Sequence, residues 1–463
     1  MEAISKSQRK ILLLASCVAS AITPMTGSMM NLSLVGIGGE FIVGAHSLAY
    51  VNTIFLLSSV IFMVPISKVA DIYGRKQLFI IGLLIHVVSS FGGHFSTSYE
   101  MLLFFRFLMG MGTAAIATTA ITMITDAFPV HERGAAIGYN TASVYLGLAM
   151  GPVLGGLIND LFSWRAVFLL TVPLVFIALF AISRVDLVPK LERKKFDIFG
   201  TLLYVVAITM SVLGVINVSR PEALIVLAIG ILLFVAFFRY QQRIDNPVLS
   251  VGIFSNKVFA RSSLASFLMN SANFSVLFFI SLYLQTIGAL TSVQAGMVLV
   301  SQPIVQTLFT PYFGGLHDKM KDKRVLPTVG VAVTTLGVLV MLTLSLDVNL
   351  WTVVISLMLF GMGNAIFNPP NTTTMMSSVE AKDRSSASAT VAVVRQTGMV
   401  ASMGIAMAAI SIIMGSLDML EPSTYGNFVD VIRVSFVVSS IMCILALMAS
   451  WFRGNGSGET SEA

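Results

Sequence analysis

The sequence predicts an all-α integral membrane protein with fourteen transmembrane helices, and three observations support this fold class. The chain of 463 residues is 56% hydrophobic and 11% charged, with a mean hydropathy of +0.89, which excludes an ordinary soluble domain. Its apolar residues are gathered in fourteen runs of about twenty residues, the length of helix that crosses a bilayer. Motifs in the first part of the chain return at a nearly constant spacing in the last part.

The first apolar run follows Lys6, Arg9 and Lys10 and lacks a cleavage site, so we expect a retained helix and not a signal peptide. Only polar loops separate the runs, and no loop is long enough to fold alone. Cys17 and Cys443 lie within apolar runs, where we expect them to be packing residues. In order, the runs span 11–33, 47–68, 77–95, 100–124, 135–159, 165–184, 199–217, 222–239, 262–284, 293–314, 325–345, 350–375, 386–414 and 431–452.

Lysine and arginine are concentrated on one side of the predicted membrane. The terminal segments and every second loop hold 23 of these residues, whereas the opposite loops hold only Arg165, Arg220 and Arg433. By the positive-inside rule, the side rich in lysine and arginine is cytoplasmic. Because the number of helices is even, the sequence predicts that both termini are cytoplasmic.

The first and last parts of the apolar region resemble each other. The shared segments keep an offset of 247 to 251 residues, a difference that one small insertion or deletion explains. A single match would mean little in a glycine-rich apolar chain, but three matches in register indicate a duplicated unit. The matching pairs are Met109–Ala114 with Phe360–Ala365, His131–Arg133 with Lys382–Arg384, and Ser67–Asp71 with Gly314–Asp318.

The duplication predicts two six-helix bundles in parallel orientation, with two further helices inserted between them. Repeats related by an axis along the membrane normal occur in secondary transporters, whose substrate path lies between the halves. We therefore expect an N-terminal bundle at 1–184, inserted helices with their linkers at 185–261, a C-terminal bundle at 262–452 and a polar cytoplasmic tail at 453–463.

The fifth apolar run combines closely spaced glycines with a proline. Gly147, Gly151 and Gly155 are four residues apart and leave one helix face without side chains, with Gly156 beside them. Pro152 removes a backbone N–H and kinks the helix. Ordinary glycine-mediated packing explains the spacing by itself. The corresponding run of the second half has no proline, however, and this asymmetry favours a contact that moves during function.

The loop before the third run predicts a cytoplasmic gate. Gly74 permits a tight turn, and Asp71 can accept hydrogen bonds at a helix start. Arg75 and Lys76 face the cytoplasm, where they can pair with Asp71 or with other acids. Asp318 repeats Asp71 in the second half. A capped, positively charged loop is one interpretation, and a latch that closes when the halves meet is equally favoured.

Together these motifs resemble the major facilitator superfamily, and within it the family of fourteen-helix drug:proton antiporters. The loop Asp71–Lys76 is similar to the superfamily's signature loop, with Ser67 where glycine is usual. Arg106–Gly112 resembles the motif implicated in proton transfer, with Met109 where glutamine is common. Gly147–Gly156 resembles the glycine–proline motif of antiporters. The resemblance extends over nearly the whole chain and implies the major facilitator fold and drug efflux coupled to protons.

One departure from that family concerns charge inside the membrane. The family's first helix usually carries an aspartate five residues before an asparagine; here Asn31 is kept, but Thr26 replaces the acid. No acid lies in the middle of an apolar run, and Asp126, near a cytoplasmic helix end, is the acid that could move inward. The other coupling candidates are Arg106, which must find carbonyls or an acid, and His86, which can titrate near neutrality.

The helices that line the path in this superfamily carry polar and soft side chains, which we predict to form the substrate pocket. Amides inside a membrane more often bond to neighbouring helices, so no single residue decides the pocket. Methionine and phenylalanine add adaptable apolar surface, although they suit a loosely packed core equally well. The candidates are Met29, Asn31, Phe55, Asn270, Asn273, Phe274, Gln302, Gln306, Asn364 and Asn368.

The sequence thus predicts a multi-pass transporter of the cell membrane that exports amphipathic or hydrophobic small molecules by alternating access, with the proton gradient as energy source. We expect no enzyme activity, cofactor, metal site or nucleic acid partner, and a monomer in the lipid bilayer. The alternative is an exporter or facilitator of a neutral or anionic metabolite without proton coupling. A receptor or sensor is a weaker interpretation, because no loop forms a soluble output domain.

Overall fold

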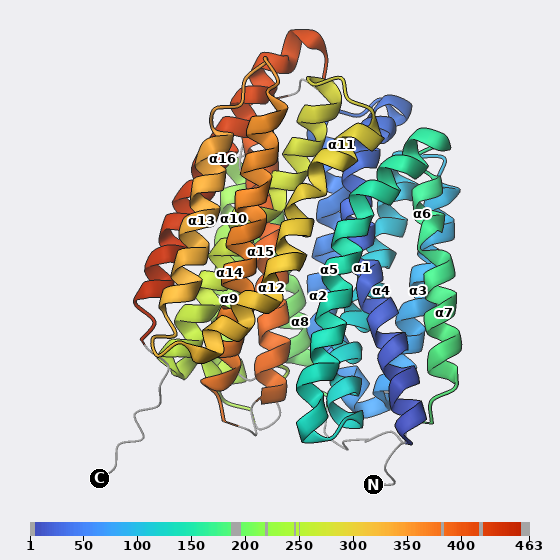
Figure 1. Cartoon of the computed structure of the whole chain (residues 1–463), viewed down its shortest axis with the longest axis vertical. Coiled ribbons are helices and arrows are strands. Elements are labelled where there is room, and N and C mark those ends of the chain that lie inside the picture. The colour runs from blue at the N-terminus through green and yellow to red at the C-terminus, as the bar shows by residue number, and fades with distance from the viewer. Residues whose placement is uncertain are drawn as a thin grey trace.

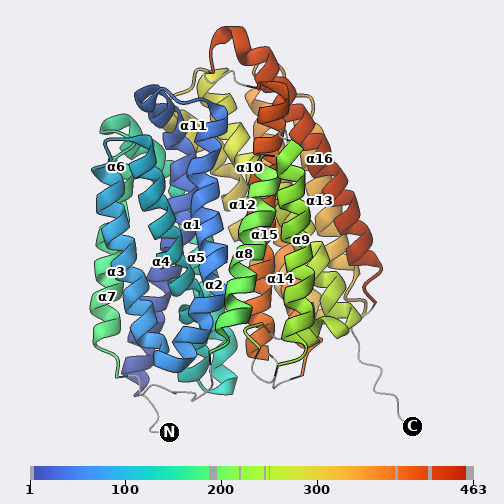
Figure 2. The same ribbon diagram turned by 180° about the vertical axis from the view of Figure 1, so that it is seen from behind.

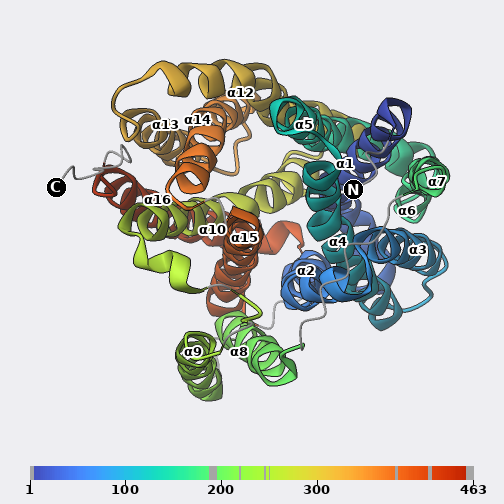
Figure 3. The same cartoon turned by 90° about the horizontal axis from the view of Figure 1, so that it is seen from below.

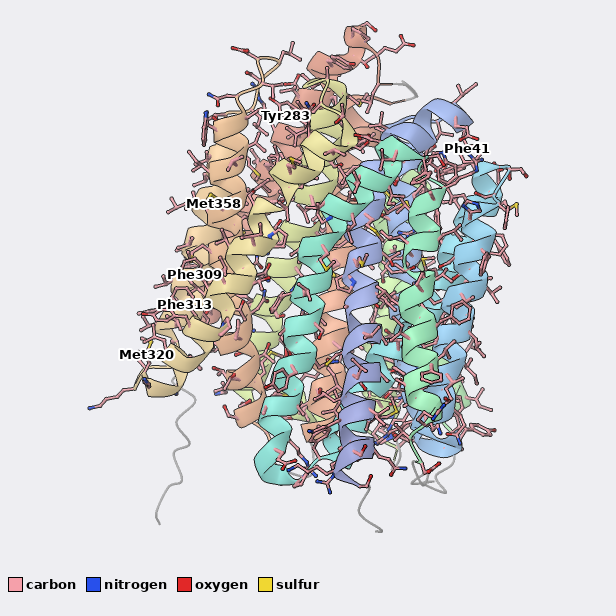
Figure 4. All side chains as sticks on the ribbon, turned by 45° about the vertical axis from the view of Figure 1, so that its right-hand side comes forward. Phe41, Tyr283, Phe309, Phe313, Met320 and Met358 are labelled. Carbon is pink, nitrogen blue, oxygen red and sulfur yellow. The ribbon has the colours of Figure 1, made fainter. Side chains whose placement is uncertain are left out.

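The computed structural model is an elongated bundle in which most helices run along the long axis (Figure 1). The helix α1 (Lys6–Phe41) begins and α16 (Tyr425–Trp451) ends at the same end of the bundle, which we call the proximal end. Phe41 and Tyr283 mark the opposite, distal end (Figure 4). The structure describes residues 5–186, 196–217, 221–244, 247–249, 251–380, 384–415 and 420–454.

The N-terminal half packs its helices around a buried apolar core. In it, α1 contacts α5 and α7, while α4 contacts α2 and α3. Gly74, with φ at +108°, separates α2 from α3 in a conformation that glycine readily adopts. Ser98 caps α4 by accepting from the N–H of Met101. The helices are α1, α2 (Ala45–Tyr73), α3 (Arg75–His94), α4 (Tyr99–Ala127), α5 (Val130–Leu161), α6 (Ala166–Leu170) and α7 (Val172–Ser183).

Two helices pack against each other on one side of the molecule, α8 (Ile198–Ile216) and α9 (Pro221–Gln241) (Figures 2 and 3). In these views α8 lies beside α2 of the first half and α15 (Arg384–Ile413) of the second, and it contacts both. The hydroxyl of Tyr204 on α8 donates a hydrogen bond to the carbonyl oxygen of Val60 on α2, at 2.9 Å. Through α8, the inserted pair therefore contacts both halves on their outer side.

The C-terminal half repeats the packing scheme of the first half. Here α10 contacts α15 and α16, and α14 contacts α12 and α13. These pairs correspond to the pairs of the first half at the offset of the sequence repeats, although the residue limits of the domains stay a prediction. The elements are η1 (Val251–Ser255), α10 (Lys257–Thr286), α11 (Ser292–Leu299), α12 (Ser301–Lys319), α13 (Val325–Met341), α14 (Leu350–Ser377), α15, η3 (Pro422–Thr424) and α16.

Each of the fourteen predicted apolar runs falls on one helix or on two consecutive helices. Within the described residues, twelve helices are long and apolar enough to cross a membrane. The run at 325–345 forms the shorter apolar helix α13, and the run at 293–314 is divided at Val300 between α11 and α12. Pro303 explains this division, because it cannot donate a hydrogen bond to the carbonyl of Leu299.

Large apolar side chains cover the outside of the bundle. Phe309, Phe313 and Met358 lie along the outer edge of the C-terminal half (Figure 4). The exposed fractions of Phe309 and Met358 are 38% and 45%. Such side chains would be a liability in water, but they suit a surface that contacts lipid.

Candidate functional site

The glycine-rich part of α5 contacts α1 of its own half and α11 of the other half. An ideal Cβ at Gly147 would lie 2.1 Å from the carbonyl oxygen of Ala21, so the backbones of α5 and α1 are in direct contact there. Nearer the distal end the same helix meets the other half, since a Cβ at Gly156 would lie 2.5 Å from the carbonyl oxygen of Ser292 on α11. Only glycine allows backbones to approach this closely.

Gly151, Gly155 and Pro152 complete this contact. Gly151 packs on α1 as tightly as Gly147 does, and a Cβ at Gly155 would lie 2.8 Å from Met29. The carbonyl oxygen of Pro152 would lie 2.4 Å from a Cβ at Gly296 on α11. The predicted glycine–proline motif therefore joins α5 both to its own half and to the opposite half.

The proximal part of α5 is packed differently. Ideal Cβ atoms at Gly134 and Gly138 meet no described atom within 4 Å. The ribbons of the two halves also spread apart toward the proximal end (Figure 1). The halves are thus in close contact near the distal end and separate toward the proximal end.

A group of hydrogen bonds holds the distal contact. The carboxylate of Asp160, at the end of α5, accepts from the backbone N–H groups of Ser292 and Val293 at 3.1 and 3.0 Å. The amide of Asn159 donates to the Ser292 hydroxyl oxygen at 2.6 Å. A negative carboxylate at the first residues of α11 is also favoured by the helix dipole. These bonds join the first half to the second.

Arg106 on α4 is fully buried, and carbonyl oxygens hold its charge in place of a carboxylate. Its Nε donates to the carbonyl oxygen of Val51 at 3.0 Å, and Nη2 donates to Asn52 Oδ1 at 3.3 Å. The guanidinium lies 4.5 Å from the centre of the Phe55 ring. Phe55, a pocket candidate, therefore packs beneath Arg106.

The bonds of Arg106 continue to the second half. Asn52 Nδ2 donates to Asn31 Oδ1 at 2.7 Å. The backbone oxygen of Asn31 in turn accepts from the hydroxyl of Ser281 on α10, at 2.7 Å. A chain of neighbouring polar groups thus runs from the buried cation through α2 and α1 to α10.

Arg75 makes its ion pairs within the first half. It donates to Asp71 Oδ1 at 2.9 Å and also pairs with Asp126. Since these acids lie on α2 and α4, Arg75 at the start of α3 ties three helix ends together. Asp126, a coupling candidate, is therefore placed at the proximal end beside a permanent positive charge.

The other predicted gate residues are Lys76 and Asp318. Lys76 Nζ donates to the carbonyl oxygen of Val185 at 2.7 Å, which ties α3 to the chain after α7. The side chain of Asp318 lies outside the described part of the structure. A latch between the halves at the proximal end stays a prediction.

His86 is fully buried on α3, away from the contact between the halves. Its Nε2 lies 3.1 Å from the hydroxyl oxygen of Thr171, at the junction of α6 and α7. Its Nδ1 has no hydrogen-bond partner among the described residues. Thr171 belongs to the first half, and His86 takes no part in the bonds of Asn159 and Asp160 that join α5 to α11.

Three of the predicted pocket residues form one amide cluster, which we call the amide site: Asn273 on α10 with Asn364 and Asn368 on α14. The Nδ2 atoms of Asn273 and Asn368 donate to Asn364 Oδ1 at 3.0 and 3.2 Å. Asn270 instead donates to the carbonyl oxygen of Ser266 on its own helix, at 2.8 Å. The structure thus brings together amides that are 91 and 95 residues apart in sequence.

The remaining pocket candidates are placed separately. Gln302 and Gln306 are buried on α12, and Phe274 is half-buried on α10. Met29 is fully buried between α1 and α5 against Gly155. Among the candidates, amide and aromatic groups therefore lie in both halves, and the thioether lies in the first half.

A sequence profile of the Major Facilitator Superfamily matches residues 15–403 and 262–462. The chain belongs to the major facilitator superfamily. Its membership agrees with the architecture, in which two halves repeat one packing scheme around a shared contact. The chain is a transporter and not an enzyme.

Relatives of this major facilitator chain have several named roles. It is 26% identical to the riboflavin transporter RibZ of Clostridioides difficile, over 80% of this chain and 82% of that protein. It is 28% identical to the multidrug resistance protein Stp of Mycobacterium tuberculosis, over 80% and 70%. Multidrug resistance protein 3 of Bacillus subtilis is 25% identical, over 76% and 70%.

Solved structures agree with the fold. A bacterial homolog of the human lysosomal transporter Spinster superposes with a TM-score of 0.72 at 16% identity, covering 97% of each chain. A D-xylose–proton symporter superposes with a TM-score of 0.71 at 13% identity, covering 97% of this chain and 99% of the other. At these identities the likeness concerns the fold alone.

Sequence reasoning about this major facilitator chain missed three residues that the contacts single out: Asn52, Ser281 and Asp160. Asn52 is the one amide in the second apolar run, a signal that could have found it. Asp160 has no partner that the sequence could predict, because Ser292 is 132 residues away in sequence. Ser281 carries no such signal, since serine is common in these helices.

Proposed function

We propose that this protein is a secondary active transporter that exports amphipathic or hydrophobic small molecules by alternating access, driven by proton antiport. The observation that carries the proposal is the contact of α5 with the other half: Gly156 and Pro152 touch α11 near the distal end, whereas Gly134 and Gly138 near the proximal start meet no described atom within 4 Å of an ideal Cβ. Two halves that are in contact at one end and apart at the other can rock against each other about that contact. The multidrug resistance relatives support export of such molecules.

The proposal includes fourteen crossings of the cell membrane by a monomer, with both termini cytoplasmic. The twelve long apolar helices, the shorter α13 and the divided pair α11–α12 supply that number. The lysine and arginine distribution supports the orientation. In that orientation the structure is closed toward the outside and corresponds to an inward-facing state.

The proposal assigns proton coupling to Arg106 and Asp126. Arg106 is the buried charge from which a chain of polar groups reaches the other half. Asp126 is an acid at the proximal end that already pairs with a cation. We propose that these two residues respond to protonation or substrate, and both can be tested directly.

The first experiment measures proton movement in proteoliposomes with an imposed pH gradient. Lipophilic cations, neutral amphiphiles and anions are added in turn, and internal pH and substrate flux are recorded together. Proton antiport predicts substrate-driven proton movement that falls at least about tenfold in Arg106→Ala and in Asp126→Asn. Arg106→Lys keeps a positive charge and serves as the control for folding. Substrate flux that ignores the pH gradient would remove the antiport claim.

A second candidate function is export or facilitated transport of a neutral or anionic metabolite without proton coupling. The specific observation in its favour is Thr26, which replaces the family's acid and bonds to the carbonyl oxygen of Ile22 at 2.8 Å. A similar protein, RibZ, is named as a riboflavin transporter. The same experiment separates the two functions, because uncoupled flux of neutral or anionic substrates favours this candidate.

A further inference from the structure

We propose that the amide site binds a neutral substrate through the substrate's own N–H or O–H donors. This inference rests on the proposed function, since it names the class of molecule that the transporter carries. Three features support it: the direction of the hydrogen bonds inside the site, an open position on the neighbouring helix α1, and the charges around the site.

The first feature is that the amide groups have only one consistent orientation. Asn364 Nδ2 donates to the carbonyl oxygen of Phe360 on its own helix at 2.9 Å, which leaves Asn364 Oδ1 as an acceptor. Asn273 and Asn368 must therefore present their amino groups to that oxygen, as their Nδ2 atoms do. Their own Oδ1 atoms consequently point away from Asn364. Beside the second N–H of each amino group, the site therefore offers these oxygen acceptors to a molecule that approaches it.

One of these acceptors is unused. Asn273 Oδ1 is buried and has no hydrogen-bond partner in the described part of the chain. Gln302 Oε1 on α12 is also buried and has no hydrogen-bond partner among the described residues. The backbone of Gln302 packs against Gly361 of α14, which lies one turn from Asn364. Native proteins rarely leave a buried acceptor unpaired unless water or a ligand supplies the donor. Both unpaired atoms are acceptors, so both lack a donor.

The second feature is an open position on α1, at Gly27, proximal to the contact between α1 and α10. Ser281 of α10 bonds to Asn31 of α1, and Asn273 lies eight residues earlier on α10, about 12 Å nearer the proximal end. On α1, Gly27 lies one turn before Asn31, and an ideal Cβ there meets no described atom within 4 Å. Gly27 thus marks an open position on α1 just proximal to this contact. Asn273 is half-buried at this level.

The third feature is the charge around the site. The helices α10, α14 and α15 contain no aspartate or glutamate. Arg395 lies one turn before Gly398 on α15, and a Cβ at Gly398 would lie 2.8 Å from Cβ of Asn270 on α10. A cation therefore stands on a neighbouring helix, which disfavours organic cations. An anion has no donor for the unpaired oxygen of Asn273, so a neutral molecule that carries an N–H or O–H group fits best.

The test compares two neutral probes that differ by one donor. Naphthalimide carries an imide N–H, and N-methylnaphthalimide has a methyl group in its place. Equilibrium binding to the purified full chain in detergent is measured by probe fluorescence, without any gradient. We expect naphthalimide to bind roughly three- to thirtyfold more tightly. Naphthalenesulfonate and tetraphenylphosphonium, an anion and a donor-free cation, should bind more weakly than naphthalimide.

Two pairs of variants test whether the difference in affinity between the two imides arises at the amide site. Asn273→Ala should abolish the preference for naphthalimide, whereas Asn140→Ala should keep it, because Asn140 is a buried amide bonded to Ser20 on the proximal part of α1. Gly27→Leu fills the open position on α1 and should weaken binding of both imides. Gly39→Leu is its control, since Gly39 is equally open but lies at the distal end of α1.

The outcomes separate this inference from the proposed function. Equal binding of the two imides, binding of neither, tighter binding of the sulfonate, or a preference that survives in Asn273→Ala would overturn the inference. Transport of the same probes is measured separately in proteoliposomes. A protein that prefers naphthalimide but transports neither imide supports the site and refutes the transport function. A protein that transports both imides equally supports transport and refutes the site.

Discussion

At the scale of single residues, charge inside this protein is held mainly by neutral groups. Arg106 is fully buried and bonds to the carbonyl oxygen of Val51 and the amide oxygen of Asn52. An arginine can be satisfied in this way because its five N–H donors point in a fixed fork. The buried cation is therefore coupled to the orientation of Asn52, and through Asn52 to Asn31.

Outside the membrane-spanning helices, Asp322 provides a charge whose pH dependence can be predicted. Hydrogen bonds from the side chain and backbone N–H of Arg324, at 2.9 to 3.0 Å, lower the pKa of Asp322. Because its pKa in the folded state is lowered, the stabilisation is present above the ordinary pKa of aspartate, about 4. It is lost as the pH falls through the lowered value.

Asp322→Asn should therefore lower Tm at pH 7 and leave it unchanged in strong acid. The side chains of Asp322 and Arg324 are each 32% exposed, so solvent screens the pair and the expected change is about one to two degrees. The measurement is thermal unfolding in detergent from pH 7 to pH 2, at low and high salt. Arg324→Ala removes the other partner of the same pair. The double variant should have about the same Tm as either single variant. Equal effects at all pH values would contradict the assigned cause.

At the scale of elements, the two ends of α5 differ in the space beside their glycines. A Cβ at Gly147 would lie 2.1 Å from a backbone oxygen, which cannot move without separating α1 from α5. Gly134, on the same helix, has no described atom within 4 Å of its ideal Cβ. One helix therefore contains both a tight position and an open one, which makes a matched pair of substitutions possible.

Gly147→Ala should destabilise the protein by about 1–3 kcal/mol, because the added methyl group overpacks the contact between α1 and α5. Gly134→Ala should be neutral or stabilise by up to about 1 kcal/mol, since alanine favours a helix over glycine. Thermal unfolding of both variants in the same detergent decides the point. If Gly147→Ala unfolds no more easily than Gly134→Ala, the close approach of the two backbones is not a rigid contact.

At the scale of the whole molecule, the distal contact is the feature that a transport cycle must break. Asp160 and Asn159 at the end of α5 bond to the start of α11, and the residues involved belong to opposite halves. If the halves alternate between two arrangements, covalent closure of this contact must stop the cycle.

A disulfide between Asn159→Cys and Ser292→Cys should therefore abolish transport, and a reductant should restore it. The side-chain atoms Asn159 Nδ2 and Ser292 Oγ are 2.6 Å apart, so the two side chains face each other across the contact, and formation of the cross-link is verified before flux is measured. The native Cys17 and Cys443 are first replaced by alanine, and flux is measured in proteoliposomes under oxidising and reducing conditions.

The control for this lock joins two helices of one half. Asn140 and Ser20 are bonded at 2.8 Å between α5 and α1, so Asn140→Cys with Ser20→Cys forms a cross-link of similar length. That cross-link should leave flux within about twofold of the reduced protein, because the halves remain free to move. Transport that persists with the distal lock closed would contradict alternating access at this contact.

The sequence by itself determined the elements and the family of this protein. Runs of about twenty apolar residues predict helices because a backbone in lipid must satisfy its own hydrogen bonds. Every predicted run falls on a helix, and the motifs around Asp71, Arg106 and Pro152 predicted the superfamily that the profile confirms. Prolines explain where a run is divided between two helices, as ahead of Pro303.

Only the tertiary structure decided which residues meet. The partners of Asp160, Asn31 and Asn273 lie on helices far away in sequence, and helix periodicity places a residue on a face without naming the neighbour across it. Whether an amide bonds to its own helix, as Asn270 does, or to another helix depends on how the helices pack. The sequence therefore predicted the kinds of side chain at the site, and packing decided which of them form it.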